Sequence, residues 1–447
     1  MLRVLIGLPA YSASADFFGQ RHMDRIIIRG GNSLRGEVRV SGAKNAALPI
    51  LASTILGGEE CILSNVPRVK DVVTMGKLLG MLGACVKSEA GRIAVGAGVL
   101  RSTEAPYELV KTMRASVLVL GPLLARWGEA VVSLPGGCSI GTRPVNLHLA
   151  GLAKLGADVN IEHGYIRARA RRLRGARIYL DQPTVTGTEN LMMAACLAEG
   201  ATVIENAAKE PEIVDLASFL SKRGARIAGA GSDVITVEGV SELQGADHEV
   251  IPDRIEAGTF LVAGAITGGN VCVEGCQPSH LEAVLMKLRE SGAEVTEGKE
   301  YVRLKAARRP RGVDVKTLAY PGFPTDMQAQ MMALMCLAEG TSVITETVFE
   351  SRFIHVPELR RMGAEIKVEG SHAVVNGREM LAGAPVMASD LRASAGLILA
   401  GLAAEGETQI SRVYHLDRGY ERIEEKLHGL GAVIRRVKEG AGIAGTG

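Results

Sequence analysis

The chain has 447 residues, 47% of them hydrophobic and 22% charged, which is enough for two or three domains with separate cores. A formal net charge of +2 argues against binding nucleic acid or a membrane surface through bulk charge. No apolar run is long enough for membrane insertion, and the seven scattered cysteines favour a reducing cytoplasm over a disulfide framework. We therefore expect a cytoplasmic globular protein.

Both ends of the chain fall outside the pattern of the rest. Residues 1–22 precede Met23, and their short apolar stretch is too interrupted for a signal peptide. We expect an N-terminal extension over 1–22 that is disordered or foreign to the native protein, and a tail over 441–447.

Between these ends, one unit of about 70 residues recurs six times. A Gly-Ala doublet follows a helical pattern at Gly83, Gly156, Gly224, Gly292, Gly363 and Gly431. A second series ends the preceding helix at Gly58, Gly128, Gly200, Gly269, Gly340 and Gly406. Each glycine suits a helix C-cap with positive φ. Each unit reads strand, helix, strand, helix, strand, strand.

Six such units predict two α/β domains of three units each, with helices packed inward and sheets outside. The boundaries fall near Lys44 and Ile251, so one domain spans 44–251 and the other combines 23–43 with 252–440. The strand expected at 25–40 follows no hairpin, and we expect it to complete the second domain. The chain then crosses between the domains twice.

Cations recur where the first or second helix of a unit is expected to begin: Lys44, Arg114, Arg143, Arg352, Arg392 and Arg418. A helix N-terminus carries a positive dipole end, so cations there are unfavourable unless an anion binds. The pattern favours a cleft between the domains for a small, multiply charged anion. The alternative is a set of solvated helix caps. The basic runs at 167–177 and 303–311 contain no interleaved aromatic residues and suit a solvated rim better than RNA binding.

One loop, residues 134–144, holds three glycines and two prolines around Cys138. This composition excludes regular helix or strand. A thiol titrates near pH 8.5 and responds to nearby charge, so Cys138 beside Arg143 is suited to proton transfer near neutrality. The alternative is a free cysteine in a turn. Two other cysteines, Cys272 and Cys276, lie close together in the sequence. No second pair follows at the spacing of a zinc site, and we expect no metal there.

Five segments together resemble a known family. They are Ser41–Pro49, Lys111–Ser116, the Pro135–Pro144 loop, Phe323–Gln330 and Asp417–Glu424. In this order, and over 23–438, they resemble the UDP-N-acetylglucosamine 1-carboxyvinyltransferases, enolpyruvyl transferases that open peptidoglycan synthesis. The resemblance implies two inside-out α/β domains of three βαβαββ units each, in agreement with the repeats. It implies phosphoenolpyruvate and UDP-N-acetylglucosamine as substrates, no cofactor and no metal.

The resemblance also implies roles for individual residues. Lys44, Arg143 and Arg418 would hold the phosphate of phosphoenolpyruvate. Arg352 and Arg392 would hold its carboxylate, and Asn45 would orient the substrates. Cys138 would be the general acid, and the target of the epoxide fosfomycin, with Asp326 as the base and Lys44 and Arg418 completing the catalytic set. The nucleotide-sugar site would comprise Asn45, Arg114, Arg143, Pro144, Val145, Asn146, Leu147, Gln182, Pro183, Thr184, Val185, Asp326 and Val348.

Two segments depart from the family pattern. Asn146 stands where Asp is usual, and Gln182-Pro183-Thr184 replaces a segment that contains Lys. Both departures concern nucleotide recognition. The rival readings are 5-enolpyruvylshikimate-3-phosphate synthase, which lacks the cysteine loop, and an inactive homologue that serves as a binding protein.

Overall fold

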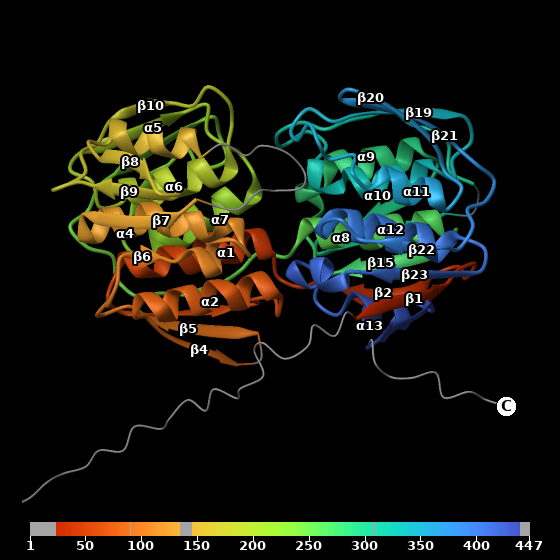
Figure 1. Ribbon diagram of the computed structural model, residues 1–447, viewed down its shortest axis with the longest axis horizontal. Coiled ribbons are helices and arrows are strands. Elements are labelled where there is room, and N and C mark those ends of the chain that lie inside the picture. The colour runs from red at the N-terminus through yellow and green to blue at the C-terminus, as the bar shows by residue number, and fades with distance from the viewer. Residues whose placement is uncertain (1–23, 90, 135–144, 307–308, 439–447) are drawn as a thin grey trace, which may run out of the picture.

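The computed structural model describes residues 24–89, 91–134, 145–306 and 309–438. Its buried apolar side chains form two separate cores. Figure 1 shows the two parts of the chain that surround these cores lying next to each other. We call the part around the core that runs from Ala43 to Val250 the first lobe. The second lobe surrounds the core that combines 26–40 with 255–434. The expected N-terminal extension and C-terminal tail, with Cys138, Arg143 and Pro144, lie outside the described residues.

The first lobe carries three four-stranded sheets, each with two main helices. Their elements are β14 (Asp247–Glu249), α1 (Lys44–Ser53), β3 (Glu60–Ser64), α2 (Lys70–Leu82), β4 (Cys85–Glu89) and β5 (Arg92–Gly96); β6 (Glu104–Ala105), α4 (Leu120–Trp127), β7 (Glu129–Ser133), α5 (Asn146–Lys154), β8 (Asp158–Glu162) and β9 (Tyr165–Arg169); and β10 (Arg177–Tyr179), α6 (Val185–Ala195), β11 (Ala201–Glu205), α7 (Pro211–Lys222), β12 (Arg226–Ala228) and β13 (Val234–Glu238). Short helical turns occur at η1 (Thr54–Leu56), α3 (Tyr107–Val110) and η2 (Arg114–Val119).

The second lobe repeats this plan with three more sheets. Its elements are β2 (Arg35–Arg39), α8 (Arg254–Ile266), β15 (Asn270–Glu274), η3 (Pro278–His280), α9 (Glu282–Glu290), β16 (Glu294–Glu297) and β17 (Tyr301–Lys305); β18 (Val315–Lys316), η4 (Thr325–Met327), α10 (Gln328–Met335), β19 (Thr341–Thr345), α11 (Val356–Arg361), β20 (Glu365–Glu369) and β21 (His372–Asn376); and β22 (Pro385–Met387), α12 (Leu391–Ala403), β23 (Glu407–Ser411), η5 (Val413–Arg418), α13 (Ile423–Gly429), β24 (Val433–Val437) and β1 (Arg25–Arg29).

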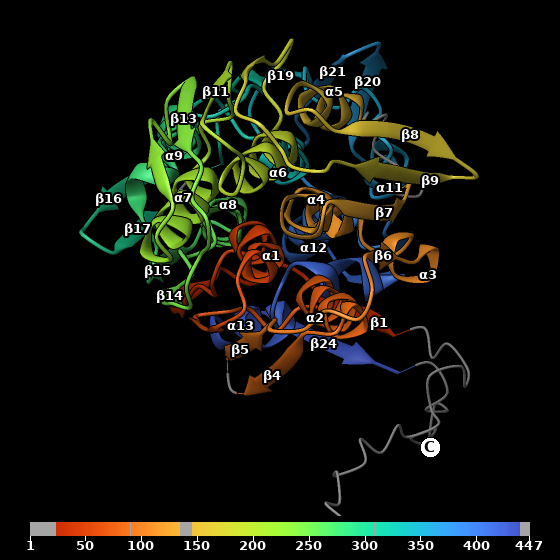
Figure 2. The same ribbon diagram turned by 90° about the vertical axis from the view of Figure 1, so that its left-hand side faces the viewer.

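The helices lie inside each lobe and the sheets outside, as the repeats predicted. Figure 2 shows α1, α4 and α6 at the centre of the first lobe, with its sheets at the rim. The first helix of a unit is buried almost all round; in α8 every residue from Ile255 to Ile266 is buried. A helix that is apolar on every side needs such a site. Strands such as β11 and β19 alternate between exposed and buried residues because only one face meets the core.

The expected single strand at 25–40 is wrong. This segment forms two strands in two different sheets of the second lobe: β1 pairs with β23 and β24, and β2 pairs with β15. Each closes a unit that would otherwise lack a strand. In the first lobe, β14 plays the same part. It is the last strand of that lobe in the sequence, and it pairs in parallel with β3, which belongs to the lobe's first unit.

The structure confirms one of the two predicted series of helix-ending glycines completely and the other in four of six positions. All six glycines of the Gly-Ala series have φ between +91° and +113° and follow a second helix, so the predicted C-caps are confirmed. The other series fails twice. Gly58 does not have positive φ, because the chain leaves η1 through Gly57 in an extended conformation. In the unit of α8, Gly268 takes the left-handed conformation instead of Gly269.

The chain passes between the lobes at two adjacent segments, 41–43 and 251–253. The amide of Ala43 donates to the carbonyl of Ile251 at 2.7 Å, and the amide of Asp253 donates to the carbonyl of Ser41 at 2.9 Å. Lys44 and Arg254 therefore begin α1 and α8 side by side, one helix entering each lobe.

Candidate active site

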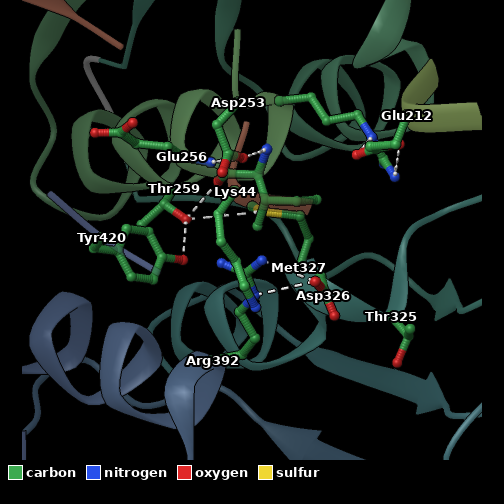
Figure 3. Close-up of polar contacts among 12 residues, drawn as sticks. Lys44, Glu212, Asp253, Glu256, Thr259, Thr325, Asp326, Met327, Arg392 and Tyr420 are labelled. Atoms are coloured by element: carbon green, nitrogen blue, oxygen red, sulfur yellow. Dashed lines mark hydrogen bonds and ion pairs between the residues drawn. The ribbon is translucent and has the colours of Figure 1, made fainter. Parts of the chain in front are cut away.

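Asp326 is the centre of a cluster of charges in the second lobe (Figure 3). It lies in η4, directly before α10, and accepts hydrogen bonds from two arginines. Arg352 Nη2 lies 2.9 Å from one carboxylate oxygen, and Arg392 Nη2 and Nε lie 2.9 and 3.2 Å from the other. The proposed base and the two proposed carboxylate ligands thus form one network.

Both arginines are unusually buried for charged residues, with side chains 4% and 3% exposed for Arg352 and Arg392. Burial, the largest single influence, lowers the pKa of Arg392, but the charge and hydrogen bonds of Asp326 together with the effects of Tyr420 and Asp253 outweigh it, and the net pKa is raised. Within the described chain, Arg352 Nε and Arg392 Nη1 have no hydrogen-bond acceptor. Each buried donor without a partner costs about 1–3 kcal/mol.

Glu346 holds the turn that carries Arg352 and Val348. One of its oxygens accepts from the amide of Val348 at 2.8 Å, and the other accepts from the Thr325 hydroxyl at 2.8 Å. That hydroxyl oxygen also accepts from Arg352 Nη1 at 2.8 Å. Glu346 is 1% exposed. Through Thr325 it holds Arg352 in place beside Asp326.

Tyr420, two residues after the end of η5, supports the same network. Its hydroxyl lies 3.0 Å from Thr259 Oγ1 and accepts from Gln330 Nε2 at 3.2 Å. The guanidinium of Arg392 lies 5.4 Å from the centre of the Tyr420 ring, within cation–π range. Figure 3 shows Tyr420 and Thr259 joined on one side of Arg392, with Asp326 joined to Arg392 on the other.

A second cluster centres on Asp71 in the first turn of α2. Its carboxylate lies 3.0 Å from Lys44 Nζ and 2.9 Å from Arg418 Nε. Burial alone would raise the pKa of Asp71, but the charges of Lys44 and Arg418 outweigh it and the net pKa is lowered. Because Arg418 belongs to the second lobe, this carboxylate joins the two lobes.

Other charged contacts cross between the lobes near these clusters. Lys70 Nζ lies 2.8 Å from Asp417 Oδ2, and Arg254 Nε lies 3.0 Å from Glu212 Oε1. The lobes therefore meet through ion pairs on both sides of the crossover segments.

The proposed nucleotide-sugar residues of the first lobe that the structure describes lie at the starts of four helices. Arg114 begins η2, Val145 precedes α5, which contains Asn146 and Leu147, and 182–185 lead into α6. Thr184 is the N-cap of α6, since its hydroxyl accepts from the amide of Gly187 at 3.3 Å. Asn45 is the second residue of α1.

Three expectations about the cations need correction. Arg352 precedes α11 by four residues, and Arg418 ends η5 instead of beginning a helix, because turns intervene before both helices. The described cations do not form one cluster: Lys44 and Arg418 gather around Asp71, whereas Arg352 and Arg392 gather around Asp326. Nor are these four cations unpaired, since each contacts one of these two carboxylates.

Sequence reasoning did not assign a site role to Asp71, Glu346 or Tyr420. Asp71 lies in the first turn of a helix, where an acidic residue is common, so its position gives no sign of a further role. Tyr420 lies inside the Asp417–Glu424 motif, which was the available signal. Glu346 offers no such signal, because its role depends on a turn 20 residues away from Asp326 in the sequence.

A cavity of about 1070 Å³ opens in the first lobe beside Arg126, Trp127 and 240–244, and neither cation cluster lines it. Among the residues that the structure describes, no group of three or more His, Cys, Asp or Glu side chains is arranged to hold a metal ion. No helix of this part of the chain is long and apolar enough to cross a membrane.

The fold and sequence match known proteins over nearly the whole chain. The profile of the family "EPSP synthase (3-phosphoshikimate 1-carboxyvinyltransferase)" matches residues 28–427. The crystal structure of the enolpyruvyl transferase NikO from Streptomyces tendae superposes with a TM-score of 0.84 at 26% identity, over 93% of this chain and 99% of that one. EPSP synthase from Acinetobacter baumannii, at 18% identity and a TM-score of 0.71, covers 93% of this chain and all of its own. The chain is thus an enolpyruvyl transferase of the EPSP synthase family.

Two relatives of high identity place it within that class. Proteins named UDP-N-acetylglucosamine 1-carboxyvinyltransferase from Geobacter metallireducens and Geotalea uraniireducens are 59% and 60% identical to it over 417 residues. Each alignment covers 93% of this chain and 100% of the relative. The chain belongs to the UDP-N-acetylglucosamine 1-carboxyvinyltransferases.

Proposed function

We propose that this enzyme transfers the enolpyruvyl group of phosphoenolpyruvate to the 3-hydroxyl of UDP-N-acetylglucosamine and releases phosphate. The observation that carries the proposal is the pair of buried arginines around Asp326, each with one donor that lacks an acceptor among the described residues. Such a pair suits a small carboxylate, which accepts several charge-assisted hydrogen bonds at once.

Substrate binding on this proposal is an exchange of anions. The carboxylate of phosphoenolpyruvate takes over contacts of Arg352 and Arg392, which releases Asp326 to act as a base. Its phosphate takes over contacts that Asp71 makes with Lys44 and Arg418, with Arg143 as a further ligand. The internal carboxylates keep the cations paired until the substrate arrives, so the empty cleft avoids like-charge repulsion.

The reaction then proceeds by addition and elimination. The Cys138 thiol gives its proton to the methylene carbon of phosphoenolpyruvate, and the oxygen of the sugar 3-hydroxyl adds to the adjacent carbon while its proton passes to Asp326. In the elimination the new methyl group returns a proton to the Cys138 thiolate, the C–O bond to phosphate breaks, and the vinyl double bond is restored. The departing phosphate takes the proton held by Asp326, so both residues regain their starting states. Asn45, next to Lys44, orients the two substrates.

The nucleotide sugar binds against the first lobe on this proposal. Arg114, the segment 143–147 and the segment 182–185 hold it, while Asp326 and Val348 approach from the second lobe. We treat the lobes as two domains, 44–251 and 23–43 with 252–440, and place the reaction in the cleft between them.

The product suits the first committed step of peptidoglycan synthesis, and hence a role in cell wall formation, cell shape and cell division. We place the enzyme in the cytoplasm, where reducing conditions prevail. The six cysteines that the structure describes are all unpaired, which supports this assignment.

Phosphate release tests the proposal. Purified protein with phosphoenolpyruvate should release phosphate when UDP-N-acetylglucosamine is added, and should not when shikimate 3-phosphate is added instead. Release with shikimate 3-phosphate alone would favour the synthase reading. No release with either acceptor, from protein shown to be folded by circular dichroism, would favour an inactive binding homologue.

A further inference from the structure

A buried histidine links two of the segments that we assign to the nucleotide. His148, in the first turn of α5, is 3% exposed. Its Nε2 lies 3.3 Å from Thr186 Oγ1 and its Nδ1 lies 3.1 Å from Asn190 Nδ2, both on α6. The imidazole therefore ties the start of α5 to the start of α6.

The neighbouring amide determines which imidazole nitrogen carries the proton. Asn190 Oδ1 accepts from the amide of Gly121 at 2.7 Å, and Asn190 Nδ2 donates to the carbonyl of Val117 at 2.8 Å. A backbone N–H cannot accept and a carbonyl cannot donate, so these bonds leave only one orientation for the Asn190 amide. Its second N–H then points at His148 Nδ1, which must be the acceptor. The proton of a neutral imidazole lies on Nε2.

Charge agrees with this geometry. Burial, and then the charge of Arg114, lower the pKa of His148 to about 4. Arg114 is the charged group of the described chain that faces this ring, from η2. His148 is neutral at pH 7, and as an Nε2–H tautomer it donates to Thr186.

The Thr186 hydroxyl consequently accepts from His148 and keeps its own hydrogen to donate. It makes no other hydrogen bond within the described residues, and it is partly exposed at the second position of α6. It follows directly on the segment 182–185 that we assign to the nucleotide.

We infer that Thr186 is a further nucleotide-sugar contact, a hydroxyl donor aimed at an acceptor oxygen of the nucleotide, and that His148 and Asn190 are its positioning residues. This inference deepens the proposed function and rests on it. Asn190 also bonds to Val117 and Gly121, on η2 and α4. One network thus holds η2, α5 and α6 in register, and Arg114, 145–147 and 182–185 with them.

Steady-state kinetics of Thr186→Val test the contact. Valine keeps the shape and removes only the hydroxyl, so we expect the KM for UDP-N-acetylglucosamine to rise about three- to tenfold, the value of one neutral hydrogen bond. The KM for phosphoenolpyruvate and kcat should stay within twofold. Thr236→Val is the matched control, since Thr236 is equally half-buried but lies on β13, away from the network. An unchanged KM for the nucleotide sugar would overturn the contact.

Nitrogen-15 NMR of the histidine rings tests the positioning without using activity. The His148 signals, identified by their loss in His148→Gln, should show protonated Nε2 and unprotonated Nδ1 from pH 5 to 8. A protonated Nδ1, or titration above pH 6, would overturn the positioning role. If the wild-type enzyme releases no phosphate with UDP-N-acetylglucosamine, the proposed function fails, whereas the ring signals still decide the state of His148.

Discussion

Asp71 is a single carboxylate that pairs with cations of both lobes. A carboxylate taken out of water is costly, and it persists here because Lys44 and Arg418 contact both of its oxygens. The same contacts make it a competitor of any phosphate that binds these cations. Stability and substrate affinity are therefore opposed at this residue.

Asp71→Asn separates the two effects. At pH 7 we expect a loss of about 1–3 kcal/mol in the free energy of unfolding, because the amide leaves Lys44 and Arg418 without their anion. The folded state lowers the pKa of Asp71 below its usual 3.8, so its stabilising contribution is present above about pH 4 and is lost as the pH falls through the lowered value. The difference between wild type and variant should shrink below pH 4.

Urea denaturation at pH 7, 5 and 3.5 measures this difference. Glu89→Gln on β4 provides an exposed carboxylate as a control. A difference that grows toward low pH would contradict the role given to Asp71.

Cys138 carries the proton transfer in the proposed reaction. Replacing it with serine removes the acid, and we expect turnover to fall by about 10²–10⁴ while the protein stays folded. Cys138→Asp restores an acid and should recover activity. Intact mass after treatment with fosfomycin should show one adduct on the wild type and none on Cys138→Asp. A serine variant with wild-type turnover at neutral pH would contradict the assignment.

At the scale of the element, the repeating unit depends on how its second helix ends. A glycine in the left-handed conformation follows the second helix in all six units, directly after α2 and two residues after the end of each of the other five helices. A side chain there is strained whatever space surrounds it, because Cβ approaches its own backbone.

Two glycine-to-alanine changes isolate this strain. Gly224 follows α7 with φ of +103°, whereas Gly80 lies within α2 without positive φ, and an added Cβ meets nothing within 4 Å at either site. Gly224→Ala should lower the free energy of unfolding by about 1 kcal/mol, and Gly80→Ala should raise it by about 0.5–1 kcal/mol. Thermal midpoints moving in opposite directions confirm the argument; equal shifts would contradict it.

At the scale of the whole molecule, the proposed ligands come from both lobes. Lys44, Arg114 and Cys138 belong to the first, and Asp326, Arg352, Arg392 and Arg418 to the second. The ion pairs across the gap, Asp71 with Arg418 and Lys70 with Asp417, hold one edge together before any substrate binds. A phosphate that replaces Asp71 as the partner of Arg418 would break one of these two ion pairs.

We expect UDP-N-acetylglucosamine to draw the lobes together and to bring the 135–144 loop over the site, which excludes water from the reaction. The radius of gyration in solution scattering should fall on addition of the nucleotide sugar, and Cys138 should become protected from a bulky thiol reagent. The crossover segments 41–43 and 251–253 are the natural hinges. Unchanged scattering and unchanged labelling at saturation would indicate a preformed site.

The local structure of the chain could be predicted from the sequence alone. Helix ends, hairpins and the six-fold repeat follow from glycine positions and apolar spacing, because each depends on residues a few positions apart. The two-lobe fold followed from the same pattern, whereas the family was recognised from its resemblance in five sequence motifs. The exceptions are also local in origin: Gly58 fails because a 3₁₀ turn extends α1, and the turn before α11 displaces Arg352 from the helix start.

Contacts between distant residues were decided by tertiary structure. Asp71 and Arg418 are 347 positions apart, and nothing near either residue indicates the other. The same holds for β1 and β2, which join two different sheets of the second lobe instead of forming one strand. It also holds for Asn190, whose amide fixes the proton of His148 across 42 positions. The type of a residue determines its charge and its hydrogen-bonding capacity. Which partner it contacts depends on how the whole chain packs.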